Sequence, residues 1–174
     1  MDFLSLRVSR LLLLLPVLLL LTQPALANRE YQLKAAFIYN FIKFVEWPNS
    51  PDPIKVGVLG EDPFKGELNK LETKPVGNRS IKVTQLKSLS DARYCQVVFT
   101  ADPDLAKKLV KEVAGQPVLT VSDTPDFSPQ GGCITLMSSR NRIRFSINTN
   151  TLKNAGLKAS SKLLGLAEKL YSQS

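Results

Sequence analysis

Four carboxylates that follow apolar stretches are the residues of this sequence best placed to do chemistry. Glu61 and Asp62 follow one such stretch, and Asp123 and Asp126 follow another. A carboxylate pair can exchange protons in general acid–base catalysis or hold a hard cation. Neither pair has a further group at a diagnostic spacing. Asp62 as the cap of a helix start and Asp123 as the cap of a turn are therefore the favoured interpretations.

The sequence contains no histidine among its 174 residues and only two cysteines. A Ser-His-Asp triad, a Cys-His dyad and a His-ligated metal site are therefore excluded, and two cysteines cannot complete a four-cysteine zinc site. Gly60 alone does not make a dinucleotide-binding fingerprint. These exclusions leave a binding or regulatory protein, which we favour, or an enzyme that uses only carboxylates and lysine. We expect no catalytic residue, no cofactor and no metal.

Arginines and a tryptophan are the residues best suited to bind a partner. Arg140, Arg142 and Arg144 alternate, which puts them on one side of a strand. There they would either clamp an anion or form a solvated face. Trp47 ends an apolar helix, where it would either anchor a partner, since Trp is enriched at binding hot spots, or fill the core. We take Trp47, Arg142 and Leu157 as the candidate partner-binding residues.

Cys95 and Cys133 each stand at the head of a predicted strand. A disulfide between them would close a loop of about 38 residues and contribute roughly 3–4 kcal/mol in the chain-entropy treatment. The bond requires neighbouring strands. Both states of the two cysteines, a disulfide and a pair of buried free thiols, remain possible from the sequence.

The first 27 residues have the pattern of a Sec signal peptide. Arg7 and Arg10 form a positive n-region, residues 11–21 are almost entirely leucine, and residues 25–27 form an A-x-A cleavage site. The alternative is an uncleaved anchor, but an apolar run of about 11 residues is too short to span a bilayer as a helix. We expect cleavage after Ala27 and an exported mature chain.

The net charge of +8 becomes +7 in the mature chain, because the signal carries two Arg and one Asp. This charge suits an anionic membrane surface, an acidic protein face or an acidic ligand. Export argues against a nucleic-acid partner, and after signal cleavage no segment is expected to insert into the membrane.

Apolar periodicity divides the mature chain into alternating helices and strands. It predicts helices over residues 30–47, 64–71, 102–113 and 152–171. It predicts strands over residues 54–59, 81–86, 96–100, 117–121, 133–137 and 143–147. The order indicates a single α/β domain over residues 28–174. We expect a three-layer sandwich, with a mostly parallel central sheet of about five or six strands and helices on both faces.

Five segments of the chain resemble the YfiR family of periplasmic regulators, in the family's order and spacing. The matching segments are residues 31–48, 55–64, 95–101, 117–136 and 141–168. The resemblance implies a periplasmic homodimer that binds and represses the periplasmic sensor domain of an inner-membrane diguanylate cyclase. Such a repressor keeps cyclic-di-GMP low and limits biofilm formation.

The resemblance carries over no catalytic residues, because the family has none established. Well-studied members hold more cysteines, in two disulfides that support redox sensing. This chain has only Cys95 and Cys133, so the resemblance does not extend to a redox switch.

A periplasmic small-ligand-binding protein of the envelope is the alternative function. The loops at residues 60–64 and 122–132 follow predicted strands, and together they would form its pocket.

Overall fold

The computed structural model describes residues 23–49, 51–139 and 141–172. Most of the predicted signal peptide lies outside these residues, and its cleavage stays a prediction. Among the described helices, none combines the length and apolar character that a membrane span requires.

Helix α2 (Gln23–Phe44) is the longest described helix and supplies much of the core. Ile38, Phe41 and Ile42 are fully buried on it. The helix was predicted to reach Trp47, but it gives way to strand β1 (Val45–Glu46). Two causes act together: Pro48 disfavours a helical residue before it, and β1 pairs antiparallel with β8 (Lys158–Ala159) in a small separate sheet.

Seven strands form the central sheet within the described residues, in the order β3-β2-β4-β5-β6-β7-β9. Their bounds are β2 (Ile54–Val58), β3 (Ile81–Gln85), β4 (Val97–Thr100), β5 (Leu119–Ser122), β6 (Ile134–Ser139), β7 (Arg142–Asn148) and β9 (Lys169–Tyr171). The first five are parallel to one another, β7 runs antiparallel to β6, and β9 runs parallel to β7. The predicted mostly parallel sheet is confirmed, with β9 as the strand that was not predicted.

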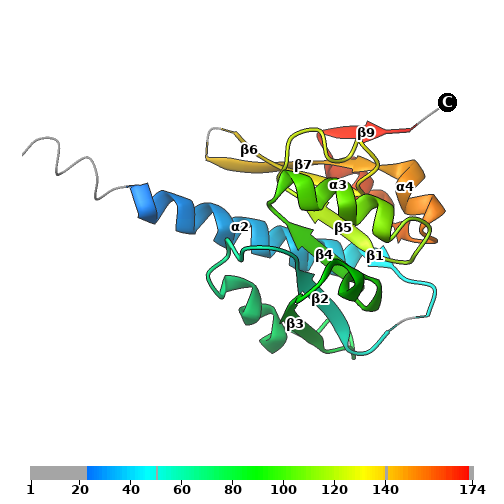
Figure 1. Ribbon diagram of the computed structural model, residues 1–174, viewed down its shortest axis with the longest axis horizontal. Helices are drawn as coiled ribbons and strands as arrows, with labels where there is room; N and C mark the ends of the chain where they lie inside the picture. Colours follow the sequence, from blue (N-terminus) through cyan, green and yellow to red (C-terminus); the bar gives the residue numbers. More distant parts are fainter. Residues whose placement is uncertain (1–22, 50, 140, 173–174) are drawn as a thin grey trace, which may run out of the picture.

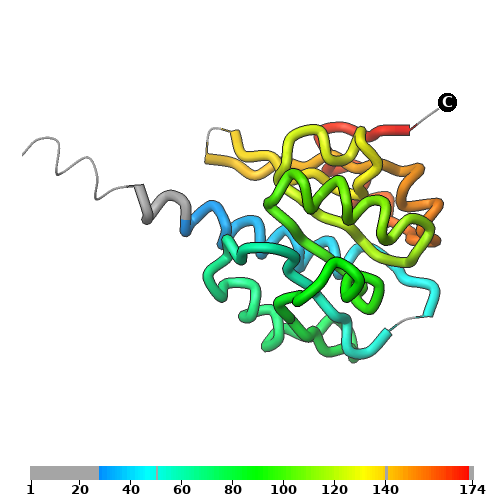
Figure 2. Tube along the Cα trace, viewed as in Figure 1, coloured from blue at the N-terminus to red at the C-terminus, as the bar shows by residue number. Residues whose placement is uncertain are grey.

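Helices cover both faces of this sheet, as predicted (Figure 1). One core joins α2 to the 3-10 helix η1 (Glu67–Thr73), and a second core joins α3 (Pro103–Glu112) to the 3-10 helix η2 (Leu89–Tyr94). Adjacent residues of β4 show the division, because Val97 belongs to the α2 core and Val98 to the α3 core. Figure 2 follows the chain from α2 in blue to β9 in red, at the edge of the sheet opposite β3.

The single helix predicted over residues 152–171 is wrong. The structure has two short helices there, α4 (Thr149–Asn154) and α5 (Ser161–Leu166), separated by β8 and followed by β9. The helix predicted over residues 64–71 is shifted along the chain. The structure has the 3-10 helix η1 there, which begins at Glu67.

Turn-forming residues explain the break between the two short helices. Gly156 has a φ of 69°, a left-handed conformation that terminates helices. The Ser160 hydroxyl then accepts a hydrogen bond from the Leu163 amide and starts α5. Beyond α5, the Glu168 amide donates to the Phe145 carbonyl, which begins the pairing of β9 with β7.

Candidate functional site

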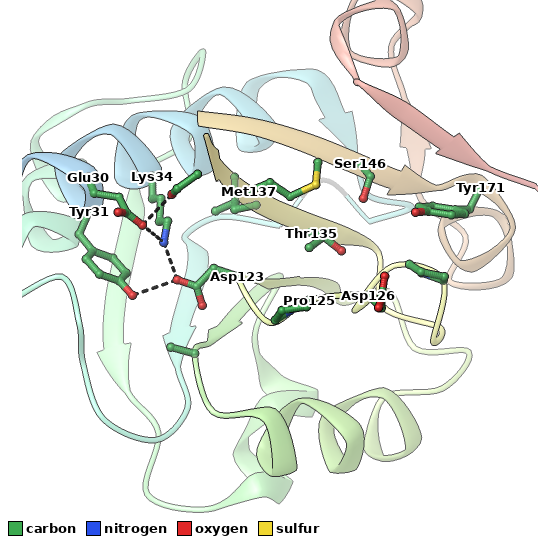
Figure 3. A pocket seen from close by; sticks show the side chains of 14 residues that line it. Glu30, Tyr31, Lys34, Asp123, Pro125, Asp126, Thr135, Met137, Ser146 and Tyr171 are labelled. Carbon is green, nitrogen blue, oxygen red and sulfur yellow. Dashed lines mark hydrogen bonds and ion pairs between the residues drawn. The ribbon is translucent and has the colours of Figure 1, made fainter. Parts of the chain in front are cut away.

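A cleft of about 600 Å³ lies beside the carboxyl ends of β4 and β5 (Figure 3). Ala101 follows β4 and Asp123 follows β5, while Glu30 and Lys34 reach the cleft from α2. The carboxyl ends of parallel strands are where open α/β sheets commonly bind ligands. Strand β6 forms another wall, through Thr135 to Ser138.

A charged cluster joins α2 to the end of β5 at one end of the cleft. The Lys34 ammonium lies 2.6 Å from Glu30 Oε1 and 2.6 Å from Asp123 Oδ2, and its side chain is only 3% exposed. Tyr31 donates its hydroxyl to Asp123 Oδ2 at 2.9 Å, and Ser138 donates to Glu30 Oε1 at 2.7 Å. We call these five residues the Lys34 cluster. They connect three elements that are distant in the sequence.

Helix geometry explains the pairing of Glu30 with Lys34 in this cluster. Glu30 and Lys34 are four residues apart on α2, so their side chains meet on one face, in the favourable order with the acid nearer the N-terminus. The second carboxylate, Asp123, is needed because a buried ammonium is costly unless paired and hydrogen-bonded.

The cluster shifts the pKa values of two of its members. Burial raises the pKa of Glu30, but the hydrogen bonds from Lys34 and Ser138 outweigh burial, so the net pKa lies below the ordinary value. Burial and the adjacent Asp123 carboxylate raise the pKa of Tyr31, so its hydroxyl stays protonated as a donor.

The other end of the cleft is formed by the loop between β5 and β6. Asp126 has a φ of 59° in this loop and is exposed, while the neighbouring Phe127 is buried. The Ser128 hydroxyl lies 2.8 Å from Thr135 Oγ1, and Asn148 donates to the Ser128 carbonyl at 2.8 Å. These bonds attach the loop to β6 and β7. Figure 3 shows Asp126 and Tyr171 at the end of the cleft away from Lys34.

The charged and hydroxyl groups of the cleft can bind a ligand. Lys34 is enclosed by two carboxylates and is not presented as a nucleophile. Among the residues that the structure describes, no group of three or more acidic or cysteine side chains is placed to hold a metal ion.

The structure places the two predicted carboxylate pairs in different settings: Asp123 and Asp126 line the cleft, whereas Glu61 and Asp62 do not. The prediction that Asp62 caps a helix start is wrong, because η1 begins only at Glu67, with Gly66 as its N-cap. Asp62 caps a turn instead, and accepts hydrogen bonds from the amides of Phe64 at 2.8 Å and Gly66 at 3.4 Å. The prediction that Asp123 caps a turn is wrong, since its carboxylate pairs with Lys34 and Tyr31 instead. Its partners lie about half the chain away, where local spacing cannot reveal them.

The three predicted partner-binding residues do not form one surface. Trp47 is 5% exposed, and its indole donates to the Gln96 carbonyl at 3.2 Å. Leu157 is 4% exposed and belongs to the α2 core. Arg142 is exposed on the β6–β7 hairpin. A role in partner binding stays a prediction for each of them.

The other arginines of the hairpin have different settings. Arg144 forms an exposed ion pair with Glu168 at 3.1 Å. Arg140 lies outside the described residues.

Cys95 and Cys133 are both buried free thiols. They precede β4 and β6, and β5 lies between these two strands, so the requirement for neighbouring strands is not met. Burial raises the pKa of both thiols.

The structure is a three-layer α/β sandwich with a polar cleft at the ends of its strands. The chain belongs to the YfiR/HmsC-like family, whose model matches residues 31–168. The resemblance found in the sequence is therefore confirmed. Among curated proteins, none matches the sequence.

Solved structures share the fold at low sequence identity. A conserved domain protein from Vibrio cholerae O1 biovar eltor has a TM-score of 0.53 and 8% identity, over 81% of this chain and 60% of that one. The ABC domain in complex with L-Trp from Streptococcus pneumonia has a TM-score of 0.52 and 9% identity, over 76% of this chain and 59% of that one. The chain thus spans about three fifths of either relative, and at these identities the likeness concerns the fold alone.

Family membership supports a general role. The YfiR/HmsC-like family is periplasmic, regulatory and non-catalytic, and it acts on diguanylate cyclase signalling.

Proposed function

We propose that this protein binds the periplasmic sensor domain of a membrane diguanylate cyclase and represses the enzyme, which lowers cyclic-di-GMP. The match of residues 31–168 to the YfiR/HmsC-like family carries this proposal. The protein acts as a homodimer in the periplasm, after removal of residues 1–27. It performs no catalysis itself.

The hairpin between β6 and β7 is the contact surface that we propose for the cyclase. Its tip lies beside the N-terminal part of α2, where Ser138 donates to Glu30 (Figure 1). Arg142 is exposed there and available for charge-assisted hydrogen bonds to a carboxylate. Trp47 and Leu157 are buried beside β1 and β8, at the other end of α2 from this hairpin, so the proposed surface does not include them.

Intracellular cyclic-di-GMP in a strain lacking the gene tests the proposal. We expect a rise that the full gene reverses and that a copy without residues 2–27 does not. Arg142→Glu should restore less repression than Lys107→Glu, a matched reversal of an exposed charge on α3. An unchanged cyclic-di-GMP level in the deletion strain would contradict cyclase repression. Equal repression by both variants would remove Arg142 from the interface.

Binding of a small ligand is the second candidate function. The cleft favours it, because polar groups converge there on a space of about 600 Å³, within the range typical of ligand pockets. One of its loops is the predicted one, residues 122–132. Residues 60–64 do not line it, and α2 supplies the opposite wall.

A further inference from the structure

The cleft has the opposite charge to the molecule as a whole. The sequence carries a net charge of +8, but the cleft is lined by three carboxylates and one ammonium. The carboxylates are Glu30, Asp123 and Asp126, and the ammonium is Lys34. The ion pairs of Lys34 leave one negative charge in excess at its end of the cleft. A bound anion would therefore be disfavoured despite the basic character of the chain.

Asp126 adds a second negative charge that no described side chain balances. Within the described residues, the structure shows neither an ion pair nor a hydrogen bond to its carboxylate, in contrast to Asp123. Its backbone is held in the left-handed region, with the Asp126 carbonyl accepting from the Gln130 amide at 3.1 Å. The loop thereby fixes the backbone of Asp126, whose side chain lines the cleft.

The walls around Asp126 are aromatic, aliphatic and hydroxylated. Tyr171 supplies a ring at this end of the cleft, and Pro129 and Met137 supply apolar surface (Figure 3). The hydroxyls of Thr135 and Ser146 are buried and already bonded to Ser128. The Lys169 ammonium already lies over the Tyr171 ring, 4.7 Å from its centroid. The Asp126 carboxylate is therefore the group that attracts a cation, while the ring and the apolar walls favour a carbon body.

We propose that the cleft binds a small organic cation, a protonated amine with an apolar or aromatic body. The ammonium pairs with Asp126, and the body lies along Met137 and Tyr171. A bare metal ion does not fit these residues, since the described part of the chain contains no group of three acidic or cysteine side chains placed to hold one. The inference rests on the second candidate function, small-ligand binding, and is independent of cyclase repression.

A series of three compounds on one carbon skeleton tests the charge preference. Isothermal titration of the mature protein would compare 2-phenylethylamine, 2-phenylethanol and phenylacetate, which are cationic, neutral and anionic. We expect the amine to bind most tightly and the anion least, with amine affinity falling as salt rises. Thermal unfolding should show the same order, because a ligand of the native state raises the melting temperature.

One variant and its matched control test whether the ammonium of the ligand pairs with Asp126. Asp126→Asn should weaken amine binding by about tenfold, because it removes a charge-assisted hydrogen bond. Asparagine tolerates the left-handed backbone at this position, so folding should be preserved. Asp104→Asn removes an exposed carboxylate on α3, away from the cleft, and should leave affinity unchanged.

Each contrary result has its own meaning. Tighter binding of phenylacetate than of the amine overturns the charge preference and leaves small-ligand binding standing. Amine binding that Asp126→Asn does not weaken overturns the proposed site. Binding by none of the three compounds overturns the inference and counts against the second candidate function. None of these results bears on the cyclic-di-GMP measurement.

Discussion

Lys34 is the residue that attaches the N-terminal part of α2 to the sheet. Lys34→Met would leave the Glu30 and Asp123 carboxylates without their shared ammonium. Loss of one member of a buried ion pair costs about 3 kcal/mol, at the low end of the range here because both carboxylates reach solvent. Urea denaturation should show this loss, whereas Lys111→Met on exposed α3 surface should change stability by less than about 0.5 kcal/mol. Equal losses would contradict a special role for Lys34.

The lowered pKa of Glu30 predicts a pH-dependent contribution to stability. The group is ionised more readily in the folded chain than at its ordinary pKa of 4.5. Its contribution is therefore fully present above that pH and is lost as the pH falls through the folded pKa. The stability difference between the wild type and Glu30→Gln should be about 1 kcal/mol or less at neutral pH, because the carboxylate is partly exposed. It should shrink in acid, and a difference that grows below that pH would contradict the assignment.

Both thiols should be inert in the folded protein. Burial raises the pKa of Cys95 and of Cys133, and the thiolate is the reactive form. A thiol reagent such as dithionitrobenzoate should modify both residues only after denaturant is added. The melting temperature should also be the same with and without reductant. Rapid modification of the native protein would restore the case for redox sensing.

The loop between β5 and β6 depends on a glycine where a side chain has no room. A Cβ at Gly132 would overlap the buried ring of Phe127. Gly132→Ala should therefore destabilise the protein by about 2 kcal/mol in thermal or urea unfolding. Gly165→Ala is the matched control, since nothing lies within 4 Å of that position in α5. It should be neutral or stabilising by up to about 1 kcal/mol.

The central strands could be predicted because their signal is local. Runs such as residues 97–100 and 119–122 are uncharged and rich in β-branched residues, which favours buried parallel strands. Strand β9 could not be predicted in the same way. Leu163, Ala167 and Leu170 have helical spacing, and only pairing with β7 makes the last residues a strand.

The position of Lys34 on its helix is a sequence signal for the Lys34 cluster. Lys34 is in helical register with Ile38 and Ile42, which are fully buried, so it lies on the buried face of α2. A lysine in that position requires a carboxylate partner. The sequence can state that requirement, but choosing Asp123 needs the fold, since 89 residues separate the two.

At the scale of the whole molecule, export is the feature open to direct test. We expect intact-mass measurement of protein from the periplasmic fraction to show a chain that begins at Asn28. Ala27→Asp should block processing and leave the full-length precursor, because signal peptidase requires a small residue at that position. Lys43→Asp, a change downstream of the site, should leave processing intact. A mature chain with another N-terminus would move the domain boundary.

The pairing of β1 with β8 sets an order of events for an exported chain. Val45 lies early in the sequence, whereas its partner Ala159 lies in the last tenth. A chain that crosses a membrane from its N-terminus must therefore release nearly its whole length before this small sheet can close. Until then, the apolar face of α2 has no cover from α5. The contact of α2 with α5 is thus among the last to form, whereas the packing of α2 against η1 needs only the chain up to Thr73.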